Sequence, residues 1–386
     1  MHRSSGLTGT SSGYGSHDSA SPSSSSVGGH RHSSKESLSR AGLIGLRNLG
    51  NTCFMNSVLQ CLSNTKPLLD YCLKDFYMNE INTTISSMKG ALFKAFASLL
   101  QSLWKGGSSE TAVNPQAFKN QIQKFAPRFM GYSQQDAQEF LRYLLQGLHE
   151  DINTVTSKPK PITTDIDDSL SDNQKATESW RRYLRLDNSR IVDLFVGQLK
   201  STLHCTVCGH DSITFDPFWD LSLPIPKAAG TVKIQQCFDL FTKEEILDGD
   251  EKPTCSKCKM RRKCTKSLTI HKFPKILVIH LKRFSPLERY RSKLSTHVDF
   301  SAVGLDLSPY APSISRSPAC TYNLYAVSNH SGTIYSGHYT AYCKHPYSGE
   351  WHDFNDSKVS SISSGSLVSS EAYVLFYELA NQSSHL

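Results

Sequence analysis

The stretch Gly-Leu-Arg-Asn-Leu-Gly-Asn-Thr-Cys-Phe-Met-Asn-Ser, residues 45–57, brings a Gly- and Asn-rich loop to a cysteine, Cys53. The apolar residues that follow repeat at helical spacing, so the chain is predicted to become a helix just past this thiol. Unpaired N–H groups and the helix dipole at such a position lower a thiol pKa. A buried structural cysteine is the alternative, but it needs no flexible approach loop, whereas a backbone close to a substrate does. The stretch therefore predicts a nucleophilic cysteine.

The first 40 residues differ in composition from the rest of this 386-residue chain. They contain fifteen serines and almost no large apolar side chain, so they cannot bury enough surface to offset the entropy lost on ordering. We expect residues 1–41 to form a disordered tail and residues 381–386 to form a short C-terminal tail. The folded part is then expected over residues 42–380.

Apolar runs and cysteine usage indicate the compartment. The longest apolar run, residues 276–281, is far shorter than the roughly 20 residues that cross a membrane, and the N-terminus lacks the apolar segment of a secretion signal. Eleven cysteines, an odd number that includes two Cys-x-x-Cys pairs, suit reduced thiols and a metal better than disulfides. We expect a protein of the cytosol or nucleus that does not associate with membranes.

Helical and extended patterns occupy different parts of the chain. Apolar stripes at helical spacing lie within 93–103, 118–125 and 133–149, the last with Ser133 as its expected N-cap. The polar segment 156–178 is predicted to be a long surface loop. Short apolar runs bounded by turn residues follow and are predicted to be strands. These runs are 195–203, 213–218, 268–273, 276–284, 322–327, 338–343 and 373–377. Helices followed by strands indicate an α+β fold.

Two Cys-x-x-Cys pairs predict a metal site. Cys205 and Cys208 form the first pair, and Cys255 and Cys258 form the second. Two tight turns that each present two sulfurs suit tetrahedral coordination of Zn²⁺. Because four thiolates leave no open coordination position, we assign this zinc to structure and not to catalysis. Four ordinary buried cysteines are the alternative.

Six lysines and arginines lie within residues 257–266, beside the second cysteine pair. A zinc ribbon with a basic run is a pattern of nucleic-acid binding proteins. No aromatic side chain is interleaved there to stack on bases, and the net charge of +8 is modest for this length. We therefore interpret the run as a solvated hairpin tip and do not expect a nucleic-acid partner.

A cysteine nucleophile requires a general base, and the candidate is His338 in Ser336-Gly-His-Tyr. Asn355 or Asp356 follows about one hairpin later and can orient the imidazole, and the sequence does not choose between them. His352 competes as a base, but strand alternation places it on the opposite face from Asn355. The order Cys, His, Asn is that of papain-like proteases. In this scheme His338 forms an ion pair, or nearly one, with the thiol and later protonates the leaving amine.

The tetrahedral intermediate of such a reaction requires hydrogen-bond donors for its oxyanion. Asn48 and Asn51 both lie in the approach loop to Cys53. A side-chain amide from one of them, together with the backbone N–H of Cys53, can supply these donors. We favour Asn48, and a turn-forming role is the alternative for either asparagine.

Several of these segments resemble the ubiquitin-specific protease family. The segment 50–57 is similar to the cysteine box of that family, and Tyr-Ser-Gln-Gln-Asp-Ala-Gln-Glu-Phe at 132–140 is similar to its Gln-Gln-Asp segment. The segments 281–284, 337–339 and 351–356 resemble its histidine box. The resemblance runs from about residue 42 to residue 378, and the two cysteine pairs fit the zinc-bearing fingers of the family.

The resemblance implies a papain-like core shaped like a hand. It implies a thumb over about 42–155, zinc-tied fingers over about 195–275, and a palm made from the remainder. The partners would be ubiquitin and ubiquitinated proteins, and the protein is expected to be a monomer. The ubiquitin tail, which ends in Gly-Gly, would lie between thumb and palm, with Tyr339 lining its tunnel. Asp136 is the candidate partner for the arginines of that tail, or else serves only as a charge at a helix N-terminus.

The implied activity is hydrolysis of the peptide or isopeptide bond after that Gly-Gly, through a thioester. Two alternatives remain beside it. A non-catalytic zinc-ribbon scaffold would bind ubiquitin or nucleic acid and would tolerate loss of Cys53. An isopeptidase for a ubiquitin-like modifier with the same Gly-Gly end would share all the features above. A redox enzyme is the weakest alternative, since no Cys-x-x-Cys pair includes Cys53.

Overall fold

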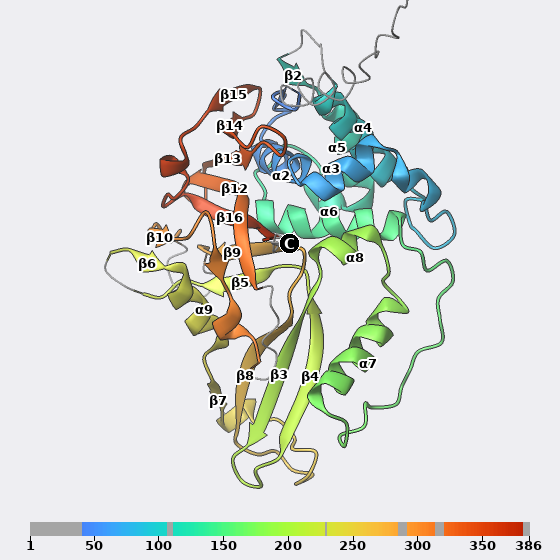
Figure 1. Ribbon diagram of the computed structural model, residues 1–386, viewed down its shortest axis with the longest axis vertical. Coiled ribbons are helices and arrows are strands. Elements are labelled where there is room, and N and C mark those ends of the chain that lie inside the picture. The colour runs from blue at the N-terminus through green and yellow to red at the C-terminus, as the bar shows by residue number, and fades with distance from the viewer. Residues whose placement is uncertain (1–40, 106–110, 228–229, 285–291, 313–319, 381–386) are drawn as a thin grey trace, which may run out of the picture.

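The computed structural model describes residues 41–105, 111–227, 230–284, 292–312 and 320–380 (Figure 1). The helices of the first part of the chain pack together into a unit that we call the thumb. They are α2 (Cys53–Ser63), α3 (Lys66–Leu73), α4 (Ala91–Trp104), α5 (Gln116–Phe125) and α6 (Ala137–Asp151). Most strands come later in the chain, which confirms the α+β class.

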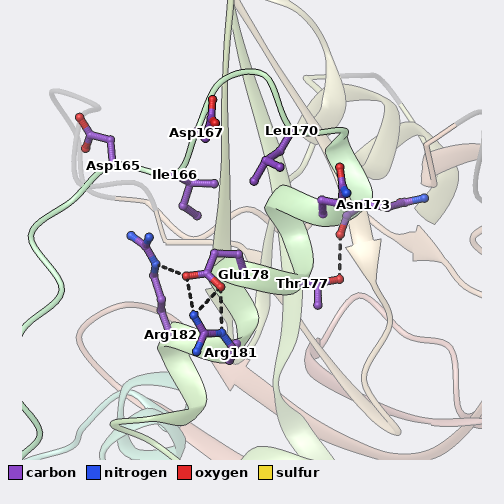
Figure 2. A pocket seen from close by; sticks show the side chains of 10 residues that line it. Asp165, Ile166, Asp167, Leu170, Asn173, Thr177, Glu178, Arg181 and Arg182 are labelled. Atoms are coloured by element: carbon purple, nitrogen blue, oxygen red, sulfur yellow. Dashed lines mark hydrogen bonds and ion pairs between the residues drawn. The ribbon is translucent and has the colours of Figure 1, made fainter.

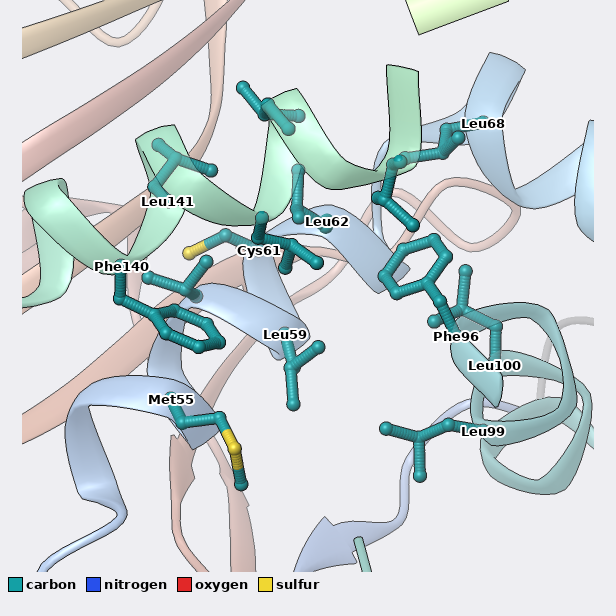
Figure 3. Close-up of a cluster of buried hydrophobic side chains, with 14 of the residues drawn as sticks. Met55, Leu59, Cys61, Leu62, Leu68, Phe96, Leu99, Leu100, Phe140 and Leu141 are labelled. Carbon is teal, nitrogen blue, oxygen red and sulfur yellow. The ribbon is translucent and has the colours of Figure 1, made fainter. Parts of the chain in front are cut away.

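Helix α2 runs through the middle of the molecule. All of its residues are buried, because it packs against α6 within the thumb and against strand β13 (Gly337–Lys344) of the neighbouring sheet. Figure 3 shows Leu59 and Leu62 of α2 in one apolar cluster with Phe96 of α4 and Phe140 of α6. Burial of each such side chain contributes about 1.5–3 kcal/mol. The helix that carries the candidate nucleophile is therefore held firmly in place.

A large sheet, which we call the palm, lies against the thumb (Figure 1). Its strand order is β15-β14-β13-β12-β16-β9-β5, with β11 paired to β12, and all pairs are antiparallel except β5 with β9. One face shares the apolar cluster of the thumb, and the other packs on a second cluster that includes α9. The remaining bounds are β5 (Leu221–Pro224), β9 (Ile276–Lys282), β11 (Leu305–Asp306), β12 (Thr321–Gly332), β14 (Trp351–Asn355), β15 (Lys358–Ser361), β16 (Ala372–Leu379) and α9 (Ile234–Thr242).

A second antiparallel sheet, the fingers, extends from the palm toward the bottom of Figure 1 in the order β4-β3-β8-β7. Its strands are β3 (Gly197–Cys205), β4 (Asp211–Phe218), β7 (Glu245–Leu247) and β8 (Cys264–Lys272). Helix α7 (Asp172–Leu184) packs along β4, and α8 (Arg190–Phe195) leads into β3. Two short parallel pairs complete the sheets, β1 (Gly45–Leu46) with β2 (Ala112–Val113) and β6 (Val232–Lys233) with β10 (Val298–Asp299).

The seven predicted strands are all present, with bounds that differ by a few residues. The predicted start of the helix at Ser133 is wrong, because α6 begins at Ala137 with Asp136 as its N-cap. The Asp136 carboxylate accepts hydrogen bonds from the backbone N–H groups of Gln138 and Glu139. A carboxylate also complements the positive end of the helix dipole, which a serine hydroxyl does not.

The predicted loop over 156–178 is wrong in its last part, where α7 begins. Ser171 and Gln174 form a capping box at its start, a signal that the polar composition of the segment conceals. The preceding loop folds back on α7, where Arg182 donates a hydrogen bond to the Thr164 carbonyl. An open pocket of about 630 Å³ lies between them, in which Glu178 pairs with two arginines (Figure 2). None of the predicted site residues lines this pocket.

The predicted tails, 1–41 and 381–386, lie outside the described residues except for Ala41. This residue is buried, and its carbonyl accepts a hydrogen bond from His345 Nε2 at 2.8 Å. The packed part of the protein therefore includes at least Ala41. Within the described ranges, no helix combines the length and the apolar character needed to span a bilayer.

Candidate active site

The approach loop owes its Gly and Asn residues to its backbone conformation. Gly50 has φ of 94° and Asn51 has φ of 54°, in the left-handed region that these two residue types tolerate best. A side chain at position 50 would also collide with the ring of Tyr132, since its Cβ would lie 2.7 Å from that ring. The loop delivers Cys53 as the first residue of α2, with only 4% of its surface exposed.

The expected lowering of the Cys53 pKa is wrong for the free protein. Burial raises the pKa of this thiol above its ordinary value, and the charge of Asp356 raises it further. Backbone N–H groups of Tyr339 and Phe54 act in the opposite direction but do not prevail. Burial has the larger effect because α2 is enclosed between thumb and palm. The hydration free energy that the thiolate loses there exceeds the stabilisation that the N–H groups of the helix terminus provide.

This shift predicts how Cys53 reacts with iodoacetamide in the free protein. Because only the thiolate reacts, the rate at Cys53 should still be rising above pH 9.0, the ordinary pKa of a cysteine. Peptide-level mass spectrometry measures this rate across pH. Asp356→Asn serves as the matched variant and should move the profile toward lower pH, because it removes a nearby negative charge. A rate that reaches its plateau near neutral pH would instead indicate a thiolate–imidazolium pair.

The predicted base and its partner meet on adjacent palm strands. His338 Nε2 lies 2.9 Å from Asn355 Oδ1, so of the two candidate partners it is Asn355 that the structure brings to the imidazole. His352 is buried on the opposite face of β14, as expected, and burial lowers its pKa. Within the part of the chain that the structure describes, no hydrogen bond joins Cys53 to His338. Asn355 therefore positions the imidazole, which makes no contact of this kind with the thiol.

Asp356 connects the palm to the approach loop instead of contacting the histidine. Its carboxylate accepts hydrogen bonds from Asn48 Nδ2 at 2.9 Å and from Asn56 Nδ2 at 2.7 Å. Asn48 Oδ1 in turn accepts from the backbone N–H groups of Gly50 and Thr52. Asn48 is thereby fixed next to Thr52, one residue before Cys53, and its amide keeps a second hydrogen that can be donated. The partners of Asp356 are too distant in sequence for any local pattern to reveal them.

Asn51, the other candidate oxyanion donor, is engaged elsewhere. Its amide donates to the Tyr132 carbonyl at 2.7 Å, which ties the approach loop to the loop before α6. The turn-forming alternative therefore describes Asn51 best.

Asp136 and Tyr339 line one pocket of about 810 Å³, together with Glu139, His330 and other residues between thumb and palm. Besides capping α6, the Asp136 carboxylate accepts a hydrogen bond from Tyr373 Oη at 2.6 Å. Asp136 is therefore a helix cap that also lines the pocket, and its role as a partner for the arginines of the ubiquitin tail stays a prediction. Burial raises the pKa of Glu139, whose carboxylate also pairs with an arginine.

Gln134 is a pocket residue that the sequence analysis did not single out. Its side-chain amide donates to the Gly337 carbonyl at 2.9 Å and accepts from the Gly337 N–H at 3.1 Å, so it bridges thumb and palm beside His338. The only sequence feature that could have indicated this role is the pair of glutamines that precedes Asp136. Gly337 itself is required because a Cβ there would lie 2.1 Å from His330 Nε2.

The four predicted metal ligands converge at the tip of the fingers. The Sγ atoms of Cys205, Cys208, Cys255 and Cys258 all lie within 4.8 Å of one another. The Cys208 and Cys255 sulfurs are 3.7 Å apart, and a tetrahedral ion with 2.3 Å bonds to sulfur needs edges of about 3.8 Å. Backbone N–H groups of Cys208 and Val207 lower the pKa of Cys205, which favours the anionic ligand form there, whereas the hydrogen bond with Cys258 raises the pKa of Cys208. This group can therefore hold a metal ion.

Some of the basic side chains in the neighbouring run are bonded to other residues of the fingertip. Arg261 donates hydrogen bonds to the backbone carbonyls of Lys252 and Asp250, and Lys263 pairs with Asp248. These contacts support the interpretation of the run as part of a folded hairpin tip.

Comparison with known proteins places the chain in a family. A sequence model described as ubiquitin carboxyl-terminal hydrolase matches residues 44–377. Ubiquitin carboxyl-terminal hydrolase 2 of Homo sapiens is 55% identical over 351 residues, which cover 91% of this chain and 57% of that protein. The protein of the same name from Gallus gallus is 58% identical over 349 residues, which cover 89% of this chain and 96% of the relative. The chain thus spans little more than half the length of the human relative.

Solved structures agree with this result. The SAGA Ubp8/Sgf11/Sus1/Sgf73 DUB module bound to ubiquitin aldehyde contains a chain that superimposes with a TM-score of 0.70 at 30% identity. The match covers 89% of this chain and 70% of that one. The family match, the identities and the shared fold agree, and the chain belongs to the ubiquitin carboxyl-terminal hydrolase family.

Proposed function

We propose that this protein is a deubiquitinating cysteine protease, which hydrolyses the peptide or isopeptide bond after the C-terminal Gly-Gly of ubiquitin. The observation that carries the proposal is the oriented His338–Asn355 pair on the palm next to a thumb helix that begins with Cys53. The relative that is solved with ubiquitin aldehyde supports ubiquitin as the substrate. We assign the roles of nucleophile, base and orienting group to Cys53, His338 and Asn355.

The proposed reaction is acyl transfer in two stages. The Nε2–H of His338 donates to Asn355, so Nδ1 is free to accept the proton of Cys53. The thiolate then attacks the glycine carbonyl, and Asn48 Nδ2 with the Cys53 N–H stabilises the oxyanion. The leaving amine takes a proton from His338, and a thioester remains. His338 next activates a water molecule, which hydrolyses the thioester and frees the enzyme.

The candidate site of the free protein, as far as the structure describes it, lacks a hydrogen bond between Cys53 and His338, which binding of the substrate would have to provide. In the free protein burial raises the pKa of the Cys53 thiol, which makes no hydrogen bond to His338, so attack requires these groups to approach each other. We propose that the ubiquitin tail does this when it occupies the pocket between thumb and palm. The Gln134–Gly337 hydrogen bonds join thumb and palm beside His338, and a tail that ends in two residues without side chains needs the least room to pass there. Carboxylates of Asp136 and Glu139 face the same pocket and suit the arginines of that tail.

We further propose that Zn²⁺ occupies the four-cysteine group. The sulfur spacing and the all-thiolate donor set fit this ion, which binds without a change of oxidation state. When bound, it supplies cross-links between the strands at the fingertip and takes no part in the reaction. The cysteines hold the fingers in the shape that contacts the ubiquitin globule.

Separate roles for Asn355 and Asp356 can be measured. Asn355→Ala should lower kcat by about a hundredfold, because the imidazole loses the partner that fixes its tautomer. Asp356→Asn keeps the size of the side chain but weakens the hold on Asn48, so it should lower kcat less. Steady-state kinetics on ubiquitin with a fluorogenic C-terminal amide, supported by melting curves, separates these effects. Equal kcat for Asn355→Ala and the parent protein would overturn the assignment of Asn355.

A panel of modifiers tests the substrate itself. The same fluorogenic group is attached to the C-terminus of ubiquitin and of ubiquitin-like modifiers that also end in Gly-Gly. We expect kcat/KM to be highest for ubiquitin. The fingers would contact the folded part of the modifier, which differs among the substrates, whereas the pocket between thumb and palm would bind the Gly-Gly end that all of them share. Preference for another modifier would identify a ubiquitin-like isopeptidase, and no turnover of any substrate would favour a binding scaffold.

A further inference from the structure

A fifth cysteine lies at the proposed zinc site without belonging to either Cys-x-x-Cys pair. Cys264 is 2% exposed and packs in one buried cluster with Cys205 and Cys255, with Cys208 and Cys258 against it. It is the first residue of β8, and Cys205 is the last residue of β3. The fingertip therefore holds one more thiol than a tetrahedral site uses.

The register of the fingers places Cys264 directly opposite Cys205. The two residues are Cα partners at the end of the antiparallel β3–β8 ladder. The next pair outward, Thr206 with Lys263, is joined by a backbone hydrogen bond from Thr206 N to Lys263 O of 3.2 Å. The Cys205 N–H points the other way, to the His210 carbonyl at 2.9 Å. Because hydrogen-bonded and non-hydrogen-bonded pairs alternate along such a ladder, Cys205 and Cys264 form a non-hydrogen-bonded pair.

This type of pair brings opposite side chains closest together. Its Cα atoms are typically about 4.5 Å apart, which lies within the range of about 4.4–6.8 Å found across disulfide bonds. Both thiols belong to one buried cluster, so no strand has to move far for their sulfurs to meet. We propose that Cys205 and Cys264 form an oxidative modification site, at which hydrogen peroxide converts the two thiols into a cross-strand disulfide.

The chemistry balances with peroxide as the only oxidant. The Cys205 thiolate attacks one peroxide oxygen and the O–O bond breaks, which leaves a sulfenic acid on Cys205, while the other oxygen takes up a proton and leaves as water. Cys264 then attacks the Cys205 sulfur, the S–O bond breaks, and the hydroxyl departs as water with the thiol proton of Cys264. Two electrons pass from the two sulfurs to the peroxide. A thiol reductant reverses the disulfide by exchange.

The disulfide would weaken metal binding, because the Cys205 sulfur cannot be bonded to Cys264 and also serve as a thiolate ligand of the metal. A disulfide with Cys264 withdraws one ligand and leaves Cys208, Cys255 and Cys258, and three sulfurs hold zinc less firmly than four. A disulfide within either Cys-x-x-Cys pair would instead withdraw two ligands. This consequence, though not the disulfide itself, rests on the proposed zinc site.

Peptide mapping of the oxidised protein tests the proposal. The Cys53→Ala variant of the 386-residue chain is used so that oxidation of the candidate nucleophile does not contribute, and its zinc content is first measured by elemental analysis. After treatment with a small excess of hydrogen peroxide, the non-reduced digest should contain a cross-linked peptide that joins Cys205 to Cys264 and is two hydrogen atoms lighter than its parts. A chromogenic chelator should take zinc from the oxidised protein several-fold faster than from the untreated protein, and dithiothreitol with added zinc should restore the slow rate.

Two further variants in the same background sharpen the test. Cys264→Ser should bind zinc like its parent but show no peroxide-accelerated release at the same dose. Cys237→Ser, which removes a buried thiol of α9 that is not part of the fingertip cysteine cluster, should behave like the parent. A different pairing of cysteines, or equal acceleration in Cys264→Ser and parent, would overturn the proposal. Absence of zinc from the fresh protein would contradict the zinc assignment alone, because the Cys205–Cys264 peptide is detected without any metal.

Discussion

Cys53→Ala should abolish turnover of fluorogenic ubiquitin, with a loss of more than about a thousandfold in kcat, because no other group can form the acyl intermediate. The variant should fold normally, because alanine differs from cysteine only by the loss of one small buried thiol group and is compatible with a helix. Binding of ubiquitin should persist, because the fingers and the pocket are unchanged. Initial rates and a direct binding measurement on the same preparation give both results.

Cys61→Ala is the matched control for this variant. Cys61 lies on the same helix, is also buried, and belongs to the apolar cluster that thumb and palm share. Its replacement should lower stability slightly while kcat changes by no more than a few-fold. Measurable turnover by Cys53→Ala, or a comparable loss in Cys61→Ala, would mean that the activity depends on helix packing and not on the Cys53 thiol.

Cys255→Ser should remove the metal and destabilise the fingers together. The described fingertip has only its small cysteine cluster as a core, so metal binding is expected to supply much of its local stability. A loss of several kcal/mol should lower the melting temperature by about 5–10 °C, or produce an earlier separate transition of the fingers. Elemental analysis and calorimetry of the same sample measure the two quantities.

The comparison variant for this second prediction is Cys264→Ser. It removes a buried cysteine from the same cluster but leaves all four sulfurs of the metal-binding group in place. Its metal content should equal that of the parent protein. If Cys255→Ser retained one equivalent of zinc, the four-thiolate site would be contradicted, and if Cys264→Ser lost it, the ligand set would have to include Cys264.

Features that depend on local sequence were predictable. The helix that begins at Cys53, the strand that carries His338 and the two Cys-x-x-Cys pairs are each encoded within a few residues. Periodicity, turn residues and ligand spacing act over such distances, so they indicate the elements and the chemistry before the fold is known. The α+β class follows from the order of these elements.

Features that arise from contacts across the molecule were not predictable. The pKa of Cys53 is raised because the palm covers a thumb helix, and the helix-terminus argument contains no information about that enclosure. Asp356 reaches Asn48 and Asn56 across 300 residues of sequence or more. Gln134 gains its partner, Gly337, only when the thumb loop meets the palm. Helix α7 was missed although its signal is local. Its capping box lies within four residues, but the polar composition of its exposed surface resembles that of a loop.

The most direct test of the account is the reaction of the protein with ubiquitin that carries a thiol-reactive electrophile at its C-terminus. Mass spectrometry of the intact adduct and of its digest shows how many ubiquitins attach and where. The account predicts one ubiquitin per protein, attached to Cys53. Attachment to another cysteine, or no adduct on folded and zinc-loaded protein, would contradict the assignment of Cys53 as the nucleophile of a ubiquitin-cleaving site.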